Sequence, residues 1–130
     1  MSPLLIAHKH YGSLLLVLIL AVIIVALTKG PNPRLQRIVA VLVDINLVVG
    51  VATLFYTLKP ISWFHPIFAL GAVGLLHASA KSEDKAKVVR CFSIALVLLV
   101  AAWSVNASWG PDFFKSTLMF KLGASAPAAQ

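Results

Sequence analysis

The sequence predicts an all-α membrane protein: four transmembrane helices in an up-down-up-down bundle, followed by a short interfacial helix. Composition is the first observation, because 60% of the 130 residues are hydrophobic and 12% are charged, whereas soluble domains carry about 25% charged residues. The second is that the apolar residues form four runs close to the length, about 20 residues, that a spanning helix needs. The third is that basic residues lie between these runs. A formal charge of +7 would suit nucleic-acid binding if the basic residues formed one stripe. They lie between the apolar runs instead, as membrane topology requires, so nucleic acid is not an expected partner.

Glycine, proline and charge set the boundaries of the four predicted spans. A helix seldom continues through Gly30-Pro31-Asn32-Pro33, so the first span ends before this segment. Lys59 and Pro60 leave almost no loop between the second and third spans. Short connections make consecutive helices antiparallel. We therefore expect a single integral membrane domain over residues 1–130, with spans at 11–28, 38–58, 63–80 and 88–105 and an aromatic interfacial segment at 109–122.

The distribution of lysine and arginine predicts the orientation. Seven basic residues lie in the first and third loops, and four lie near the opposite ends of the spans. The positive-inside rule then places both loops in the cytoplasm and both termini outside, in a bacterial plasma membrane. The seven are Lys29, Arg34, Arg37, Lys81, Lys85, Lys87 and Arg90, and the four are Lys9, Lys59, Lys115 and Lys121.

Two histidines open the spans that begin on the outer side. His10 precedes the first span and His65 begins the third. The first and third helices of such a bundle lie diagonally, across a gap wider than the ~8–10 Å between neighbours. Two imidazoles facing each other across this gap are what a six-coordinate haem needs. The sequence therefore predicts haem iron bound by His10 and His65.

Two other interpretations of these histidines stay open. In the first, His10 and His65 simply lie at the interface between membrane and water, where histidine is tolerated. Tyr11, Trp63 and Phe64 beside them form an ordinary aromatic belt. Alternatively, an extended N-terminal segment could bring His8 and His10 together with His65 in a zinc or copper site. No carboxylate or thiolate is expected nearby, because the single cysteine, Cys91, lies toward the other side of the membrane.

Polar groups in the second and third spans form the other candidate site. An ionisable group inside hydrocarbon costs about 2.5–3.5 kcal/mol, so Asp44 and His77 are expected to form a buried hydrogen-bonded pair on adjacent helices. The pair would serve either as a proton-exchange station, as in a transporter, or as a clasp between helices worth ~0.6 kcal/mol. Asn46 is expected to make a further hydrogen bond between helices.

Several of these residues resemble those of small four-helix bacterial membrane proteins labelled cytochrome b-like. The resemblance covers most of residues 7–103 and depends on short motifs. It implies a haem b bound by His10 and His65. Phe64 stands where the family would have an acidic residue, and Asn46 where it would have glutamine. The matching motifs are His10-x-Gly12, Asp44-x-Asn46-x-x-x-Gly50 with Tyr56, His65-Pro66 and Trp103.

The expected function is that of a haem b electron-transfer module or subunit in the lipid bilayer. The sequence contains no nucleotide-binding loop, no Ser-His-Asp constellation and no paired carboxylates, so an enzyme is not expected. The alternative is a non-catalytic accessory subunit that packs against other subunits of a larger respiratory or photosynthetic complex.

Overall fold

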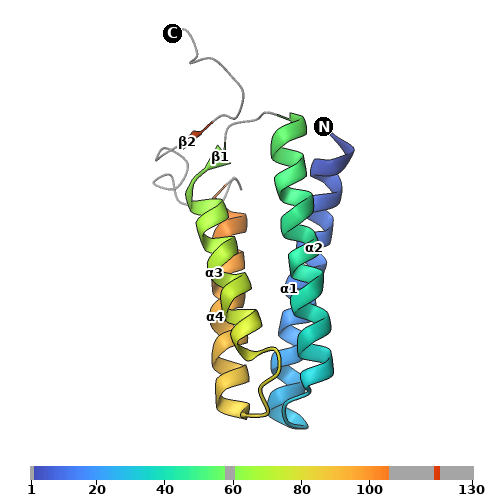
Figure 1. Ribbon diagram of the computed structural model, residues 1–130, viewed down its shortest axis with the longest axis vertical. Coiled ribbons are helices and arrows are strands. Elements are labelled where there is room, and N and C mark those ends of the chain that lie inside the picture. The colour runs from blue at the N-terminus through green and yellow to red at the C-terminus, as the bar shows by residue number, and fades with distance from the viewer. Residues whose placement is uncertain (1, 58–60, 106–118, 121–130) are drawn as a thin grey trace, which may run out of the picture.

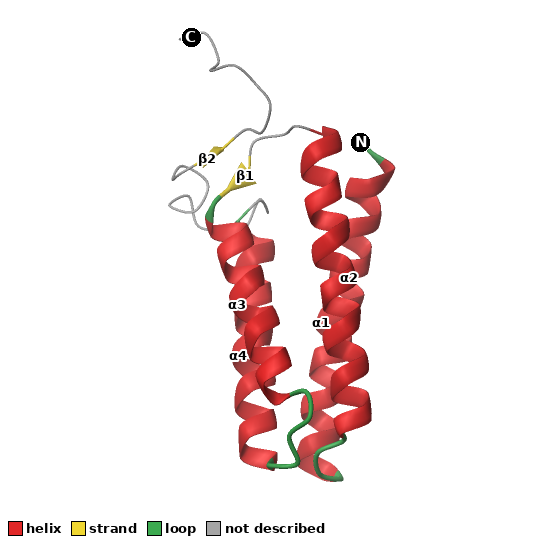
Figure 2. Cartoon of the chain, in the orientation of Figure 1, coloured by secondary structure: helices red, strands yellow, loops and turns green. Residues whose placement is uncertain are grey.

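The computed structural model describes residues 2–57, 61–105 and 119–120, which form four helices and two short strands. The helices are α1 (Pro3–Thr28), α2 (Pro33–Thr57), α3 (Phe64–Ser79) and α4 (Lys85–Ser104). They lie side by side, with the connections α1–α2 and α3–α4 at the end away from the N-terminus (Figures 1 and 2). The prediction of an all-helical fold is confirmed, and α1, α2 and α4 are each long and apolar enough to cross a membrane.

Two helices begin earlier than the sequence analysis predicted. α1 begins at Pro3 rather than at residue 11, and α2 begins at Pro33 rather than at residue 38. Proline suits the first turn of a helix, because its missing N–H is one that the helix leaves unpaired there. The early start of α1 places His8 and His10 inside a continuous helix, so the extended N-terminal segment considered above is wrong.

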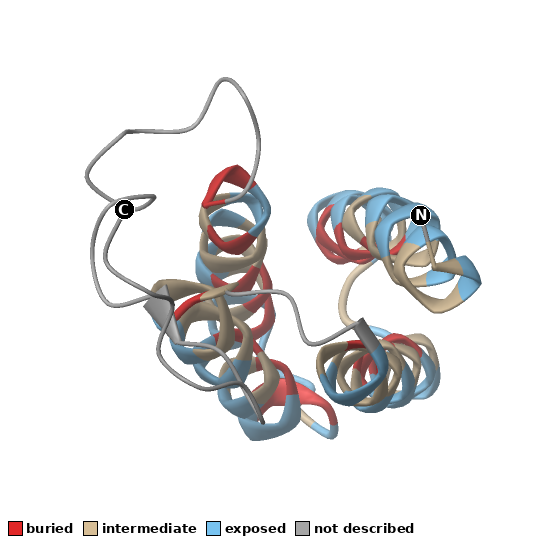
Figure 3. Ribbon diagram, turned by 90° about the horizontal axis from the view of Figure 1, so that it is seen from above, coloured by how far each residue is buried: buried red, intermediate tan, exposed pale blue. Residues whose placement is uncertain are grey.

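The helices form a ring of four. α1 packs against α2 and α4, and α3 packs against α4 and α2, so α1 and α3 are diagonal (Figure 3). The core between them is apolar, and its largest fully buried side chains include Leu15, Ile19, Leu76, Val88 and Phe92.

The outer faces of the helices are also apolar. Val17, Val48, Leu70 and Val97 lie on four different helices, and each is more than half exposed. A helix bundle in water would carry polar side chains there, whereas helices that are apolar all round are typical of membrane spans. The outer surface therefore suits contact with lipid.

A buried glutamine connects the start of α2 to the α3–α4 connection. Gln36 is fully buried, and its Nε2 donates to the carbonyl oxygens of Ser79 at 3.1 Å and Ser82 at 3.0 Å. Its Oε1 accepts from the backbone N–H of Asn32 at 2.8 Å. The two connections at this end of the bundle are thus held at the same level.

Of the predicted interfacial helix at 109–122, the structure describes Met119 and Phe120. These two residues form strand β2 (Met119–Phe120), which pairs antiparallel with β1 (Ile61–Ser62), with Ile61 opposite Phe120. The helical prediction is therefore wrong for these two residues, and the rest of the segment lies outside the described residues.

A candidate ligand site between His8 and His65

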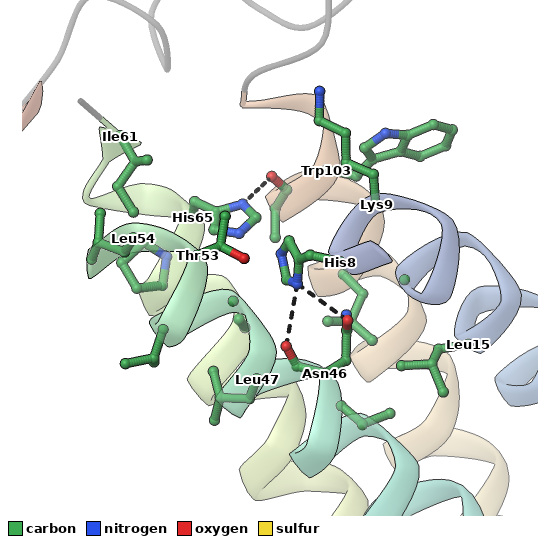
Figure 4. Close-up of a pocket in the computed structure, with 18 of the residues that line it drawn as sticks. His8, Lys9, Leu15, Asn46, Leu47, Thr53, Leu54, Ile61, His65 and Trp103 are labelled. Atoms are coloured by element: carbon green, nitrogen blue, oxygen red, sulfur yellow. Dashed lines mark hydrogen bonds between the residues drawn. The ribbon is translucent and has the colours of Figure 1, made fainter. Parts of the chain in front are cut away.

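All four helices line a cavity of about 420 Å³ toward the N-terminal end of the bundle (Figure 4). Its volume lies within the range of about 300–1,000 Å³ that is typical of ligand pockets. Most of the lining is apolar, and a few polar side chains reach it. The polar lining residues are His8, Lys9, Ser13, Asn46, Thr53 and His65.

Two histidines from diagonal helices meet at this cavity. His8 projects from α1 and His65 from the first turn of α3, and their side chains point toward each other (Figure 4). Their ring centroids are 6.1 Å apart and their planes are 72° from parallel. The predicted facing pair was His10 and His65, whereas the pair in the structure is His8 and His65.

A backbone carbonyl fixes the orientation of His65. Its Nδ1 lies 2.7 Å from the carbonyl oxygen of Ala102 in α4. A carbonyl oxygen only accepts, so Nδ1 carries the proton and donates it. The lone pair of the neutral ring is therefore on Nε2.

His8 is oriented in the same way by α2. Its Nδ1 lies 3.2 Å from the carbonyl oxygen of Asn46 and 3.1 Å from the Oδ1 atom of that residue. Both are acceptors, so Nδ1–H again donates and the Nε2 lone pair is left. Among the described residues, neither the Nε2 atom of His8 nor that of His65 has a hydrogen-bond partner. The expected interhelical hydrogen bond of Asn46 is confirmed.

Glycines allow His8 to lie against α2. A Cβ atom at Gly50 would lie 2.7 Å from Cε1 of His8, which is closer than side-chain atoms tolerate. A Cβ atom at Gly12 would lie 3.3 Å from Nδ2 of Asn46. His8 and Gly12 are four residues apart in α1, as Asn46 and Gly50 are in α2. Each pair therefore shares one helix face, and the two faces pack together.

The predicted role of His10 is wrong, because His10 is exposed and does not line the cavity. Two residues along a helix correspond to a rotation of about 200°, so His8 and His10 point to opposite sides of α1. His8 takes the place expected for His10, whereas His65 is where it was predicted. The spacing from Gly12 was a sequence signal for His8. His8 is four residues from Gly12 and therefore lies on the same helix face, whereas His10 is two residues from Gly12 and lies on the opposite side.

The three-histidine metal site is also not formed. The described residues contain no group of three or more His, Cys, Asp or Glu side chains that could hold a metal ion. His10 points away from His8 and His65 for the reason just given.

Asp44 and His77 are hydrogen-bonded to each other, as predicted. Nε2 of His77 lies 2.8 Å and 3.0 Å from the two carboxylate oxygens of Asp44. The prediction that the pair is buried is wrong, since the side chains of His77 and Asp44 are 47% and 39% exposed. The neighbouring Val43 faces the core, and one residue further along α2 turns Asp44 toward the outer surface.

The chain was compared with protein-family models, with curated proteins and with solved structures, and none of these comparisons finds a match. The cavity and its two histidines are therefore the basis for assigning a function.

Proposed function

We propose that this chain is a membrane-embedded electron-transfer module that binds a b-type haem between His8 and His65. When bound, haem supplies one-electron oxidation and reduction at its iron. The observation that carries the proposal is the facing pair of imidazoles from diagonal helices. In each, Nδ1 is hydrogen-bonded to a carbonyl, and Nε2 has no hydrogen-bond partner among the residues that the structure describes.

The separation of the two rings fits two ligands on one metal ion. A metal–imidazole bond is about 2.0–2.1 Å long, and the ring centroid lies roughly 1 Å beyond the nitrogen, so two such rings have centroids about 6 Å apart. The observed distance is 6.1 Å. His8 and His65 would therefore need little movement along the line that joins them.

The hydrogen bonds at Nδ1 support the same role. Histidine ligands almost always donate their other ring N–H to a carbonyl or carboxylate, which fixes the ring and makes the ligating nitrogen more basic. Asn46 and Ala102 provide these acceptors. Lys9 is the one cationic side chain among the described lining residues, and it is suited to pair with an acidic group at the edge of the ligand.

The proposed setting is the bacterial plasma membrane, with four spans that cross in alternating directions and both termini outside. α3 has 16 residues and is about 24 Å long at 1.5 Å per residue, somewhat less than the ~30 Å of hydrocarbon. The excess of basic residues at the α1–α2 and α3–α4 connections supports a cytoplasmic position for that end. His8 and His65 then lie in the outer half of the bilayer.

An absorption spectrum tests the proposal. The purified chain, loaded with haem, should show a Soret band and reduced α and β bands typical of two histidine ligands. His8→Ala and His65→Ala should each lose this spectrum, and the matched control His10→Ala should keep it. If the wild-type chain binds no haem, or if His10→Ala is the variant that loses it, the proposal is wrong. An accessory subunit without a cofactor would give no visible absorbance in any variant.

A further inference from the structure

The geometry points to a second property: two copies of this chain form a two-fold dimer in the membrane through the α2–α3 face, with the Asp44–His77 pairs at the contact. The pair lies on the outside of the bundle, where a single copy would present it to lipid. The inference depends on the proposed membrane setting but not on haem.

In the proposed membrane setting, the pair lies within the apolar layer, toward its cytoplasmic side. Gln36 contacts the carbonyls of Ser79 and Ser82, so it marks the level of the α3–α4 connection. Asp44 is eight residues further along α2, which is about 12 Å at 1.5 Å per residue. His77 is two residues before Ser79, which is about 3 Å. The hydrogen-bonded pair therefore lies between about 3 and 12 Å from the level of the connection, within a hydrocarbon layer about 30 Å thick that begins there.

The proton count of the pair leaves one N–H without an acceptor. In an apolar medium the pair is favoured when its net charge is zero. This holds if His77 is cationic and Asp44 is ionised, or if both are neutral and the carboxyl group donates to Nε2. In both cases Nδ1 of His77 carries a proton, and among the described residues it has no hydrogen-bond partner. Lipid chains offer no acceptor to it.

A second copy supplies the missing partner. In a two-fold contact, the same patch meets itself, so each group on one copy faces its counterpart on the other. Nδ1–H of His77 in each copy can then donate to the free lone pairs of the Asp44 carboxyl group in its partner. Two donors and two acceptors are satisfied at once, which favours a second copy as the occupant of this face.

The surface of α3 beside the pair allows close approach. Gly74 and Ala78 are exposed and four residues apart, the spacing at which small residues let two membrane helices pack closely. Within one copy, a Cβ atom at Gly74 would meet none of the described residues within 4 Å. Substitutions at Gly74 can therefore change a contact between copies without disturbing the fold of one copy.

Disulfide trapping in vesicles tests the dimer directly. The full chain with Cys91→Ser and Gly74→Cys, at high lipid excess, should give a covalent dimer on oxidation. The matched control is Cys91→Ser with Val17→Cys, because Val17 is 62% exposed on the diagonal helix α1; it should stay monomeric. Three outcomes would overturn the inference. Residue 74 does not cross-link, residue 17 cross-links equally well, or residue 74 cross-links only to a different protein.

Energy transfer between labelled copies measures the affinity. Asp44→Leu combined with His77→Leu should weaken association about tenfold, since two interhelical hydrogen bonds are lost. Gly74→Leu should abolish the dimer, whereas Val17→Phe should leave it unchanged. Far-UV circular dichroism on each variant separates loss of the dimer from loss of the fold. Association that is unchanged in well-folded Gly74→Leu would overturn the inference, and none of these readouts requires bound haem.

Discussion

Gly50 offers the most direct test of how His8 is held. Replacing it with alanine would place a methyl group 2.7 Å from Cε1, 3.2 Å from Nδ1 and 3.3 Å from Nε2 of His8. The ring or α2 must then move, and the hydrogen bond from His8 to Asn46 is strained or lost. Gly50→Ala is therefore expected to act on both the stability of the bundle and the position of a ligand nitrogen.

The size of the effect follows from three contributions. Overpacking costs about 1–3 kcal/mol, and a lost interhelical hydrogen bond costs about 0.6 kcal/mol. Alanine is better than glycine in a helix by about 1 kcal/mol. The expected net loss in the free energy of unfolding is about 0.5–2.5 kcal/mol. Haem affinity should fall by at least about tenfold, which corresponds to a ligand displacement worth about 1.4 kcal/mol.

Gly74→Ala is the matched control within one copy, measured at a detergent excess that keeps the chain monomeric, because the added Cβ meets none of the described residues within 4 Å. The same chemical change should leave the bundle unchanged or stabilise it by up to about 1 kcal/mol. Reversible unfolding in mixed micelles, followed by circular dichroism, measures both variants, and a haem titration measures the ligand site. If Gly50→Ala is as stable as Gly74→Ala and binds haem like the wild type, then His8 does not pack against α2 as described.

Three further substitutions test other parts of the structure. Asn46→Leu removes one of the two acceptors of His8 Nδ1. Haem affinity should fall about tenfold, because the hydrogen-bond partners that orient metal ligands contribute about 10–100-fold to affinity. An unchanged haem titration would contradict this role of Asn46. Gln36→Leu leaves buried carbonyls of the α3–α4 connection without a donor and should lower the unfolding free energy by about 1–3 kcal/mol, whereas the exposed neighbour Arg37→Leu should change it much less. Asp84→Ala removes the side chain that accepts from the Ala86 N–H at 3.1 Å and should cost about 1 kcal/mol at the start of α4, with Asp84→Asn close to the wild type in the same unfolding assay.

The positions of the helices could be predicted from the sequence to a large extent. Apolar runs bounded by Gly30, Pro31 and Pro33 are sufficient for that, because the bilayer fixes the length of a span. The predicted starts were wrong where polar residues continue a helix beyond its apolar run. α1 includes Lys9 and His10, since proline at its start and the local helical propensity extend it past the residues that hydropathy marks.

Which side chains face the inside of the bundle was harder to predict. One cause explains both errors at the candidate sites, the choice of His10 and the burial of Asp44. A soluble helix reveals its inner face by the contrast between apolar and polar residues. In α1, buried Leu15 and Ile19 alternate with exposed Leu14, Val17 and Leu20, all of them apolar. Hydropathy therefore carries no information about which side of a helix is inside, so it could distinguish neither His8 from His10 nor a buried Asp44 from an exposed one.

Glycine and polar residues carry the information that hydropathy lacks. Where two helices approach closely, one must present a small residue to the larger side chain of the other. Gly50 meets His8, and Gly12 meets Asn46. The four residues form two pairs with a spacing of four in the sequence. His8 has this spacing from a glycine, and His10 does not. By the same reasoning, Gly74 and Ala78 have the spacing of a contact face, and among the described residues a Cβ atom at Gly74 would meet nothing within 4 Å. Their counterpart is therefore to be sought in a second copy of the chain.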